Sequence, residues 1–282
     1  MRIDSHQHFW DYGANSRDYV WMTDEYRQLR QNFEPSDLQR QLDQCGFDGT
    51  VAVQARELEI ENEYLLNLAS KHPFILGVVG WLDLCDPDIE SRIEFYSDNP
   101  LLKGLRMLIH DRADLEFAVS PAHVNGIGLL DRFNLSYDLL LRPEHLEPAT
   151  RLVDLFPNQR FVVDHIAKPD IAAGDWEPWA SGISSFAERQ NVYCKLSSII
   201  TQCDWAEWST AQLTPYLDHV FQCFSSERLM IGSDWPVSTL AADYGTTVCQ
   251  VMDWSDRLSV GEKSAILGET CAKFYQLKLQ GG

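Results

Sequence analysis

The sequence lacks the features that mark membrane proteins and nucleic-acid-binding proteins. Its 282 residues contain no apolar run near the ~18 residues that a membrane-spanning helix requires. No basic segment followed by an apolar stretch opens the chain, as a secretory signal would. Basic residues are scarce, 23 against 42 acidic ones, and the net charge of −19 disfavours nucleic acid or an anionic membrane as a partner. We therefore expect a cytoplasmic protein that acts on a small molecule.

The cysteine pattern also excludes some classes of protein. The cysteines are seven, scattered, and never spaced as CxxC. Such a pattern predicts free thiols in a reducing compartment, and it argues against a disulfide framework or a thiolate zinc site. Internal repeats, low-complexity runs and linkers are absent as well, so we expect one domain spanning residues 1–282.

Eight short apolar segments indicate buried parallel strands, because most are continuous rather than alternating. They are Arg2–His6, Thr50–Gln54, Ile75–Leu82, Gly104–Ile109, Ser136–Leu141, Phe161–His165, Val192–Leu196 and Leu229–Ser233. Helical patterns fill most of the intervals, and one of them starts at Pro35 and stops at Gly46. This alternation predicts an α/β fold, a single (β/α)8 TIM barrel. The alternative, a doubly wound open sheet, is disfavoured because no GxGxxG follows the first strand.

Histidines and an aspartate stand at the ends of three of these segments. His6 and His8 are two residues apart on a strand, so their side chains point to the same side. His165 ends the sixth segment and Asp234 the eighth. Because a barrel builds its chemistry at the carboxyl ends of its strands, we expect the four to meet there rather than to be packed core residues. Asp234 would then take a proton from water, while the histidines or a bound ion polarise a carbonyl.

Five further side chains are candidates for substrate binding. Arg106 and Arg142 lie in or at the end of the fourth and fifth strands, where an arginine needs an anion or a polarised oxygen; a structural ion pair is the competing interpretation. Gln54 and Tyr137 can reach the site if the phase of their strands is right. Trp10 begins an aromatic connection, residues 9–33, that we expect to act as a lid or substrate wall or simply to pack over the barrel mouth.

These residues resemble the amidohydrolase superfamily, in the metal-dependent-hydrolase-like branch that contains sugar lactonases. The resemblance runs nearly end to end and rests on seven stretches: residues 4–10, 77–83, 137–146, 164–169, 194–197, 232–237 and 266–275. It implies that His6 and His8 are the first-strand pair and that Asp234 is the eighth-strand aspartate that activates water. His165 matches a later strand histidine. The implied activity is that of the L-fuconolactonases and L-rhamnonolactonases, which open the cyclic ester of an oxidised sugar.

The sequence departs from the metal-bound members of that superfamily. Their histidine at the end of strand five is replaced here by Arg142, and strand four carries Arg106. The full binuclear ligand set is therefore missing. Two possibilities stay open: no cofactor is required, or one divalent metal, zinc or manganese, binds the four residues His6, His8, His165 and Asp234. We expect the metal to be absent or dispensable, because an ester with an alkoxide leaving group needs less Lewis-acid help than an amide.

The leading hypothesis is thus a carboxylic ester hydrolase that opens an aldonolactone of the L-fucono or L-rhamnono type. A metal-dependent decarboxylase of the same superfamily is the alternative, and it should depend strictly on metal. A third hypothesis is a barrel that only binds sugar acids. It is disfavoured because a protein that only binds its ligand does not need Asp234 as a general base. The stereochemistry of the sugar and the oligomeric state are not encoded in these motifs.

Overall fold

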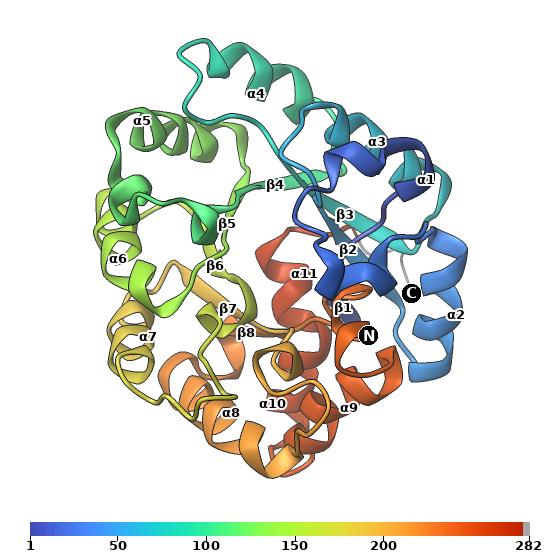
Figure 1. Cartoon of the computed structure of the whole chain (residues 1–282). Coiled ribbons are helices and arrows are strands. Elements are labelled where there is room, and N and C mark those ends of the chain that lie inside the picture. The colour runs from blue at the N-terminus through green and yellow to red at the C-terminus, as the bar shows by residue number, and fades with distance from the viewer. Residues whose placement is uncertain (279–282) are drawn as a thin grey trace.

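Eight parallel strands stand at the centre of the structure, a computed structural model that describes residues 1–278 (Figure 1). The strands are β1 Ile3–Gln7, β2 Gly49–Val53, β3 Ile75–Gly80, β4 Leu102–Met107, β5 Ser136–Leu139, β6 Phe161–Val163, β7 Val192–Leu196 and β8 Leu229–Ile231. Each predicted apolar segment contains its strand or overlaps it. Most strand residues are buried, because helices cover the outside and side chains fill the inside.

The strands pair in chain order, each parallel to the next. Beyond the end of β8 the chain returns to β1: the Asp234 N–H donates to the His6 carbonyl at 2.8 Å, and the His8 N–H donates to the Trp235 carbonyl at 2.7 Å. Gln7 and Trp235 form an isolated parallel bridge. These contacts nearly close the barrel, so the predicted (β/α)8 fold is confirmed, and they join two of the predicted site segments directly.

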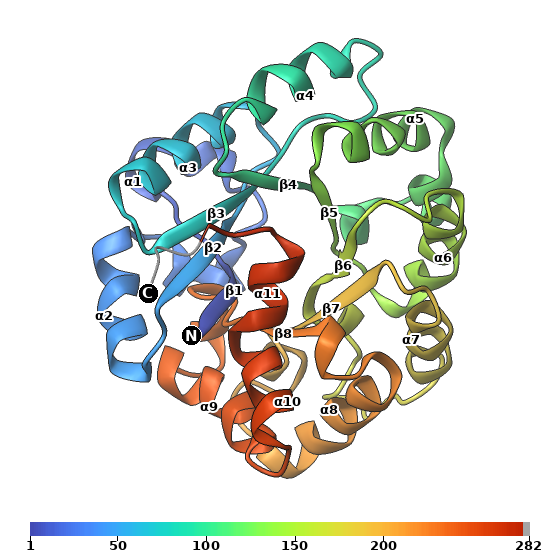
Figure 2. The same ribbon diagram turned by 180° about the vertical axis from the view of Figure 1, so that it is seen from behind.

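A ring of helices surrounds the strands, as the front and back views show (Figures 1 and 2). The helices of that ring and its connections are α1 Tyr12–Asn15, α2 Pro35–Cys45, α3 Ile60–Lys71, α4 Ile89–Ser97, α5 Pro121–Leu130, α6 Leu146–Leu155, α7 Trp179–Ala187, α8 Thr210–Phe224 and α9 Tyr244–Ser255. The residues at which these helices begin and end are determined by local capping interactions. In α2, Pro35 occupies the first turn, Glu34 and Asp37 form a capping box, and Gly46 ends the helix at φ +71°.

The last segment covers one end of the barrel. It consists of α10 Val260–Ser264, a π-helical turn at Ala265–Glu269, and α11 Thr270–Phe274. Side chains of α11 pack with inward-facing apolar residues of five strands; these are Ile3, Val51, Val53, Val79, Val162 and Met230. The Tyr275 hydroxyl reaches Asp138 on β5 at 2.7 Å. This end is thus sealed by apolar packing, which leaves the opposite end for the site.

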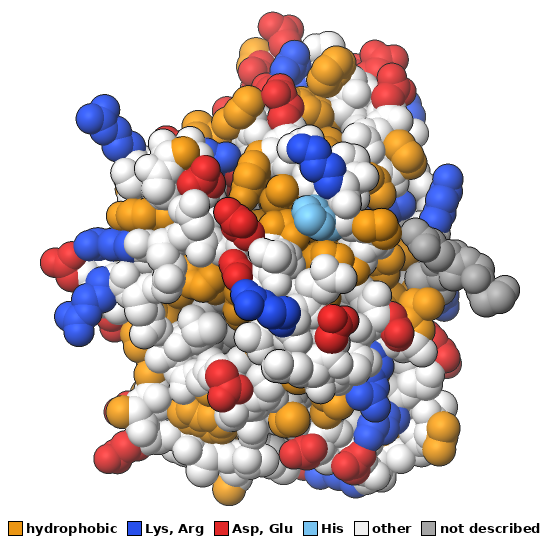
Figure 3. Space-filling view, turned by 90° about the vertical axis from the view of Figure 1, so that its right-hand side faces the viewer, with side chains coloured by type: hydrophobic (Ala, Val, Ile, Leu, Met, Phe, Trp, Pro, Cys, Tyr) orange, Lys and Arg blue, Asp and Glu red, His pale blue; other side chains and the backbone are white. Residues whose placement is uncertain are grey.

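The outer surface carries mixed charge. Acidic and basic side chains are interspersed over the face in Figure 3. Within residues 1–278, no helix has the length and apolarity needed to cross a membrane.

Candidate active site

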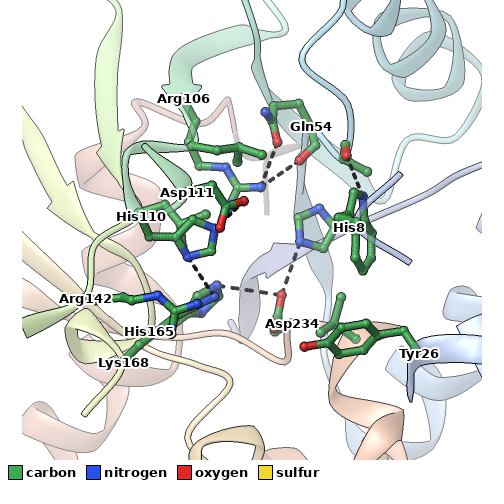
Figure 4. Close-up of a pocket in the computed structure, with 15 residues that line it drawn as sticks. His8, Tyr26, Gln54, Arg106, His110, Asp111, Arg142, His165, Lys168 and Asp234 are labelled. Atoms are coloured by element: carbon green, nitrogen blue, oxygen red, sulfur yellow. Dashed lines mark hydrogen bonds and ion pairs between the residues drawn. The ribbon is translucent and has the colours of Figure 1, made fainter. Parts of the chain in front are cut away.

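A cavity of about 420 Å³ opens at the carboxyl ends of the strands, within the range of ~300–1,000 Å³ common for small-molecule sites (Figure 4). Its wall comprises His8, Trp21, Tyr26, Gln54, Ala55, Arg106, Leu108, His110, Asp111, Leu140, Arg142, His165, Lys168, Asp234 and Val237. Three of these residues are basic and two are acidic. The cavity is therefore locally cationic in a protein whose net charge is strongly negative.

His6, His8 and Asp234 meet at the base of this cavity, as the sequence predicts. All three are buried. His6 Nε2 lies 3.3 Å from His8 Nε2, and Asp234 Oδ1 lies 3.2 Å from His8 Nε2 and 3.6 Å from His6 Nε2. Burial opposes charge on Asp234, but the neighbouring histidines and the hydrogen bond to His8 outweigh it and hold its pKa below the usual value. Asp234 is therefore an ionised acceptor for a proton.

The hydrogen bonds of His8 determine which of its nitrogens faces Asp234. Nδ1 lies 2.8 Å from the Val53 carbonyl, which only accepts, so Nδ1 carries a hydrogen. In the neutral ring Nε2 then holds a lone pair, and it faces a carboxylate oxygen 3.2 Å away. Two acceptors do not face each other stably. A proton or a cation must lie between them.

The donors around this point fit a divalent metal ion. Donor atoms bound tetrahedrally to zinc at about 2.0–2.1 Å lie roughly 3.3–3.4 Å apart, and the three separations among His6, His8 and Asp234 are 3.2–3.6 Å. The outer nitrogen of His8 also has the partner that ligand histidines usually have, a backbone carbonyl, while that of His6 lies 3.1 Å from the Lys195 ammonium and 3.3 Å from the Asp164 carboxylate. The site can therefore hold a divalent metal.

His165 reaches the site through an unusual backbone turn. It belongs to four consecutive residues with positive φ, His165 to Lys168, at 56°, 49°, 61° and 48°. Left-handed conformation costs non-glycine residues roughly 1–2 kcal/mol each, so the surrounding contacts must enforce it. The turn places His165 Nε2 3.8 Å from Asp234 Oδ1 and lets Lys168 line the cavity too. Burial lowers the pKa of His165 to about 3, which keeps the ring neutral.

Beneath His6 lies a buried network of charged residues. Arg106 on β4 contacts Asp164 at 2.9 Å, and Lys195 on β7 lies 3.0 Å from Asp164, 2.5 Å from Asp138 and 3.1 Å from His6 Nδ1. Despite burial, Lys195, His6 and Arg106 hold the pKa of Asp164 well below its usual value, whereas burial raises that of Asp138 to about 6. Opposite charges thus compensate one another, and the network holds His6 in place.

Of the predicted substrate-binding residues, Gln54, Arg106 and Arg142 line the cavity. Arg106 donates from Nη2 to both the side-chain and backbone oxygens of Gln54, at 2.7 Å each. Both the substrate-facing position and the ion pair considered for Arg106 are therefore present. Arg142 lies exposed at the rim.

Trp10 and Tyr137 lie elsewhere, which corrects the prediction that they contact substrate. Both are fully buried. The Trp10 indole N–H donates to the Leu29 and Gln31 carbonyls, so Trp10 holds the aromatic connection together from inside. On β5, Asp138 faces the barrel interior; by alternation Tyr137 faces outward, where its hydroxyl meets His123 at 2.9 Å. The prediction for Tyr137 was wrong because the assumed alternation along β5 was out of phase by one residue.

That connection, residues 9–33, forms a lid over part of the cavity. Trp10 and Phe33 pair at its base, and Trp21 and Tyr26 line the cavity. Arg56 ties the lid to the barrel, because it donates to Asp18 in the lid at 2.9 Å and to the buried Glu61 at 2.6 Å. Both alternatives considered for these aromatics, packing and cavity wall, are thus realised by different members.

Sequence reasoning missed His110, Asp111 and Lys168 as cavity residues. His110 Nδ1 lies 3.3 Å from Lys168 Nζ, and its Nε2 lies 3.2 Å from Asp111 Oδ2. Burial lowers the pKa of His110 to about 4 and that of Lys168 to about 8. His110 and Asp111 directly follow the fourth predicted segment, Gly104–Ile109, and that position was the one signal that the sequence offered. Lys168 carried none, because nothing in the sequence indicates a left-handed turn.

The site thus combines an eight-stranded barrel with an ionised aspartate and three buried histidines at the carboxyl ends of its strands, a set of groups that can activate water. A profile of the amidohydrolase family matches residues 3–277, and the chain belongs to that family. The predicted resemblance is confirmed. L-fucono-1,5-lactonase from Burkholderia ambifaria is 34% identical over 286 residues, covering 100% of this chain and 98% of that protein. L-fucono-1,5-lactonase from Burkholderia multivorans is also 34% identical, covering 98% of this chain and 96% of that protein.

A solved structure has the same architecture. The crystal structure of an amidohydrolase from Burkholderia multivorans with bound zinc superimposes with a TM-score of 0.94 at 33% identity, covering 99% of this chain and 100% of that one. A metal is thus present in a relative of the same fold, in agreement with the donor geometry described above.

Proposed function

We propose that the protein hydrolyses the cyclic ester of a sugar acid, an aldonolactone of the L-fucono-1,5-lactone type, to the open-chain acid. The observation that carries this proposal is the ionised Asp234 carboxylate among His6, His8 and His165, at the base of a cavity sized for a small molecule. The two L-fucono-1,5-lactonases, each 34% identical over nearly the full chain, support the choice of substrate. An L-rhamnonolactone differs in hydroxyl configuration and is the first competitor to compare.

Asp234 supplies the base in this proposal. Water held at the base of the cavity gives a proton to the carboxylate as its oxygen adds to the lactone carbonyl carbon. His6 and His165 stay neutral, since burial lowers the pKa of both, so they compete little for that proton. The Arg106 guanidinium, 3.3 Å from His6 Nε2, supplies positive charge and N–H donors near the point where negative charge develops on the carbonyl oxygen.

The rest of the cavity orients the sugar. Gln54 and Arg142 present polar groups to hydroxyls, while Trp21 and Tyr26 of the lid offer flat apolar faces to C–H groups. Closure of the lid over the cavity would exclude bulk water and strengthen each of these polar contacts.

His6, His8 and Asp234 would hold a divalent ion, which when bound supplies Lewis-acid polarisation of the carbonyl. We propose that turnover does not depend on it. The Arg106 guanidinium lies 3.3 Å from His6 Nε2, so a positive charge and an N–H donor already occupy the neighbourhood where the ion would act. A lactone also needs little activation, since its alkoxide leaving group departs more readily than an amine.

A panel of substrates tests the proposed reaction. L-fucono-1,5-lactone, L-rhamnono-1,4-lactone and a hydroxybenzoate are incubated with the purified protein, and acid formation and carbon dioxide are measured together. We expect one acid equivalent for each L-fuconolactone opened, slower opening of the rhamnonolactone, and no carbon dioxide. Carbon dioxide release without lactone opening would identify the decarboxylase instead.

A further inference from the structure

The turn that carries His165 also fixes the position of a lysine. Residues 165 and 168 are three apart in a left-handed turn, and both line the cavity. In Figure 4, Lys168, His110 and Arg142 lie on the side of the cavity opposite His8, with Asp234 between the two sides. Four consecutive residues hold a conformation that costs free energy, and the turn places two functional nitrogens at one cavity.

Hydrogen bonding fixes the direction of the Lys168 ammonium. An ammonium only donates, so the contact of 3.3 Å makes His110 Nδ1 the acceptor. The hydrogen of the neutral His110 ring is then on Nε2, where Asp111 Oδ2 accepts it at 3.2 Å. This chain from ammonium to imidazole to carboxylate uses one of three N–H bonds of Lys168. Within residues 1–278 no other hydrogen bond to Nζ is found, which leaves two N–H bonds for a substrate.

The other donors on this wall are less able to give up a proton. Both nitrogens of His110 are engaged, one by Lys168 and the other by Asp111. The guanidinium groups of Arg106 and Arg142 keep their protons at any ordinary pH. Lys168 is therefore the group on this wall that combines free N–H bonds with a transferable proton.

We propose that Lys168 is the catalytic acid that protonates the departing ring oxygen, with His110 and Asp111 positioning it; this inference rests on the proposed lactonase function. Asp234 takes one proton from water while the water oxygen bonds to the carbonyl carbon. The tetrahedral anion then collapses, the bond from that carbon to the ring oxygen breaks, and the ring oxygen leaves with a proton from Lys168 Nζ as a hydroxyl. Asp234 returns its proton to solvent, and Lys168 regains one from solvent. The sum is lactone plus water to hydroxy acid.

A comparison of leaving groups tests this role. The substrates are L-fucono-1,5-lactone and its 1,5-thiolactone, in which sulfur replaces the ring oxygen, because a thiolate leaves without needing a proton. Lys168→Met should lower kcat on the lactone by about 100-fold or more and on the thiolactone by less than about tenfold. Lys168→Arg keeps the charge but cannot release a proton, so it should be as impaired as Lys168→Met on the lactone.

Arg142→Met, which removes another cation from the same wall, is the matched control and should affect both substrates equally. The proposal is overturned if Lys168→Arg restores lactone turnover, or if Lys168→Met impairs both substrates alike or raises only KM. If the wild type does not hydrolyse the thiolactone, the arginine variant decides alone. Failure of the wild type to open any lactone would instead refute the proposed function, so the two failures are distinguishable.

Discussion

At the scale of single residues, the site contains charged carboxylates that are buried, although burial normally disfavours the charged form. Asp234 stays ionised because the neighbouring histidines and the hydrogen bond to His8 outweigh the cost of its burial, and Asp164 does so because Lys195, His6 and Arg106 lie against it. Each carboxylate thus has its own compensation, and the two have different tasks. Asp234 faces the cavity, where we propose that it acts as a base, whereas Asp164 lies below and contacts His6.

Asp234→Asn removes the base while keeping the shape of the side chain. We expect kcat for lactone opening to fall by about 10²–10⁴-fold, because an amide cannot take the proton of water. Steady-state kinetics, with circular dichroism to confirm folding, provide the measurement. Asp43→Asn, on the exposed face of α2, is the control and should leave kcat unchanged. Retention of more than about a tenth of the activity in Asp234→Asn would show that another group is the base.

At the scale of elements, the regular strands were predictable and the segments just after them were not. Continuous apolar runs reveal buried strands, and alternation correctly placed His6 and His8 together. Alternation could not place His165, because the chain leaves β6 in a left-handed turn that depends on tertiary contacts. Alternation also failed for Tyr137, because a shift of one residue along a strand moves a side chain from the barrel interior to the outer face, which the helices cover. The sequence indicated the lid only as a long connection rich in aromatic residues. It did not indicate the ion pair through which Arg56 holds the lid to the barrel.

One contact between the lid and the barrel, the ion pair of Asp18 with Arg56, can be removed without disturbing the barrel. Asp18→Asn breaks the ion pair with Arg56, while Arg56 keeps its bond to Glu61. Because a partly exposed ion pair contributes at most ~1 kcal/mol, we expect KM to rise about two- to fivefold with kcat nearly unchanged.

Asp24→Asn is the matched control for this change. It breaks another ion pair of the lid, with Arg30, at a side chain that is 95% exposed. The same increase in KM in both variants, or in neither, would mean that the Arg56 tie does not position the lid.

At the scale of the whole molecule, the barrel buries several neutral histidines. His123 is an example away from the site: Nδ1 donates to the Ala118 carbonyl at 2.8 Å, Nε2 accepts from Tyr137, and burial lowers its pKa to about 4. A histidine whose pKa is lowered by folding stabilises the protein fully above its unfolded pKa. That contribution is lost as pH falls, because the unfolded chain takes up a proton near pH 6.5 that the folded chain refuses.

We therefore expect the free energy of unfolding to fall with pH between about 6.5 and 4, His123 alone accounting for a loss on the order of 3 kcal/mol. Denaturant unfolding of the wild type and of His123→Asn across this range is the measurement. The free energy of unfolding should change less steeply with pH in the variant, because its unfolding takes up about one proton fewer. Burial raises the pKa of Asp4 and Asp138 to about 6, which has the opposite effect, but both proteins share it. Parallel slopes would contradict the buried neutral His123.

We propose above all that Asp234 and its histidines open a sugar lactone without needing a metal. The most direct measurement is proton release when L-fucono-1,5-lactone is added to chelator-treated, metal-free protein, with zinc returned to a parallel sample. We predict acidification by the metal-free protein within about threefold of the zinc-loaded rate, because the polarising groups belong to the chain itself. Acidification only after zinc is returned would show that the ion is required, and no acidification in either sample would contradict the lactonase account altogether.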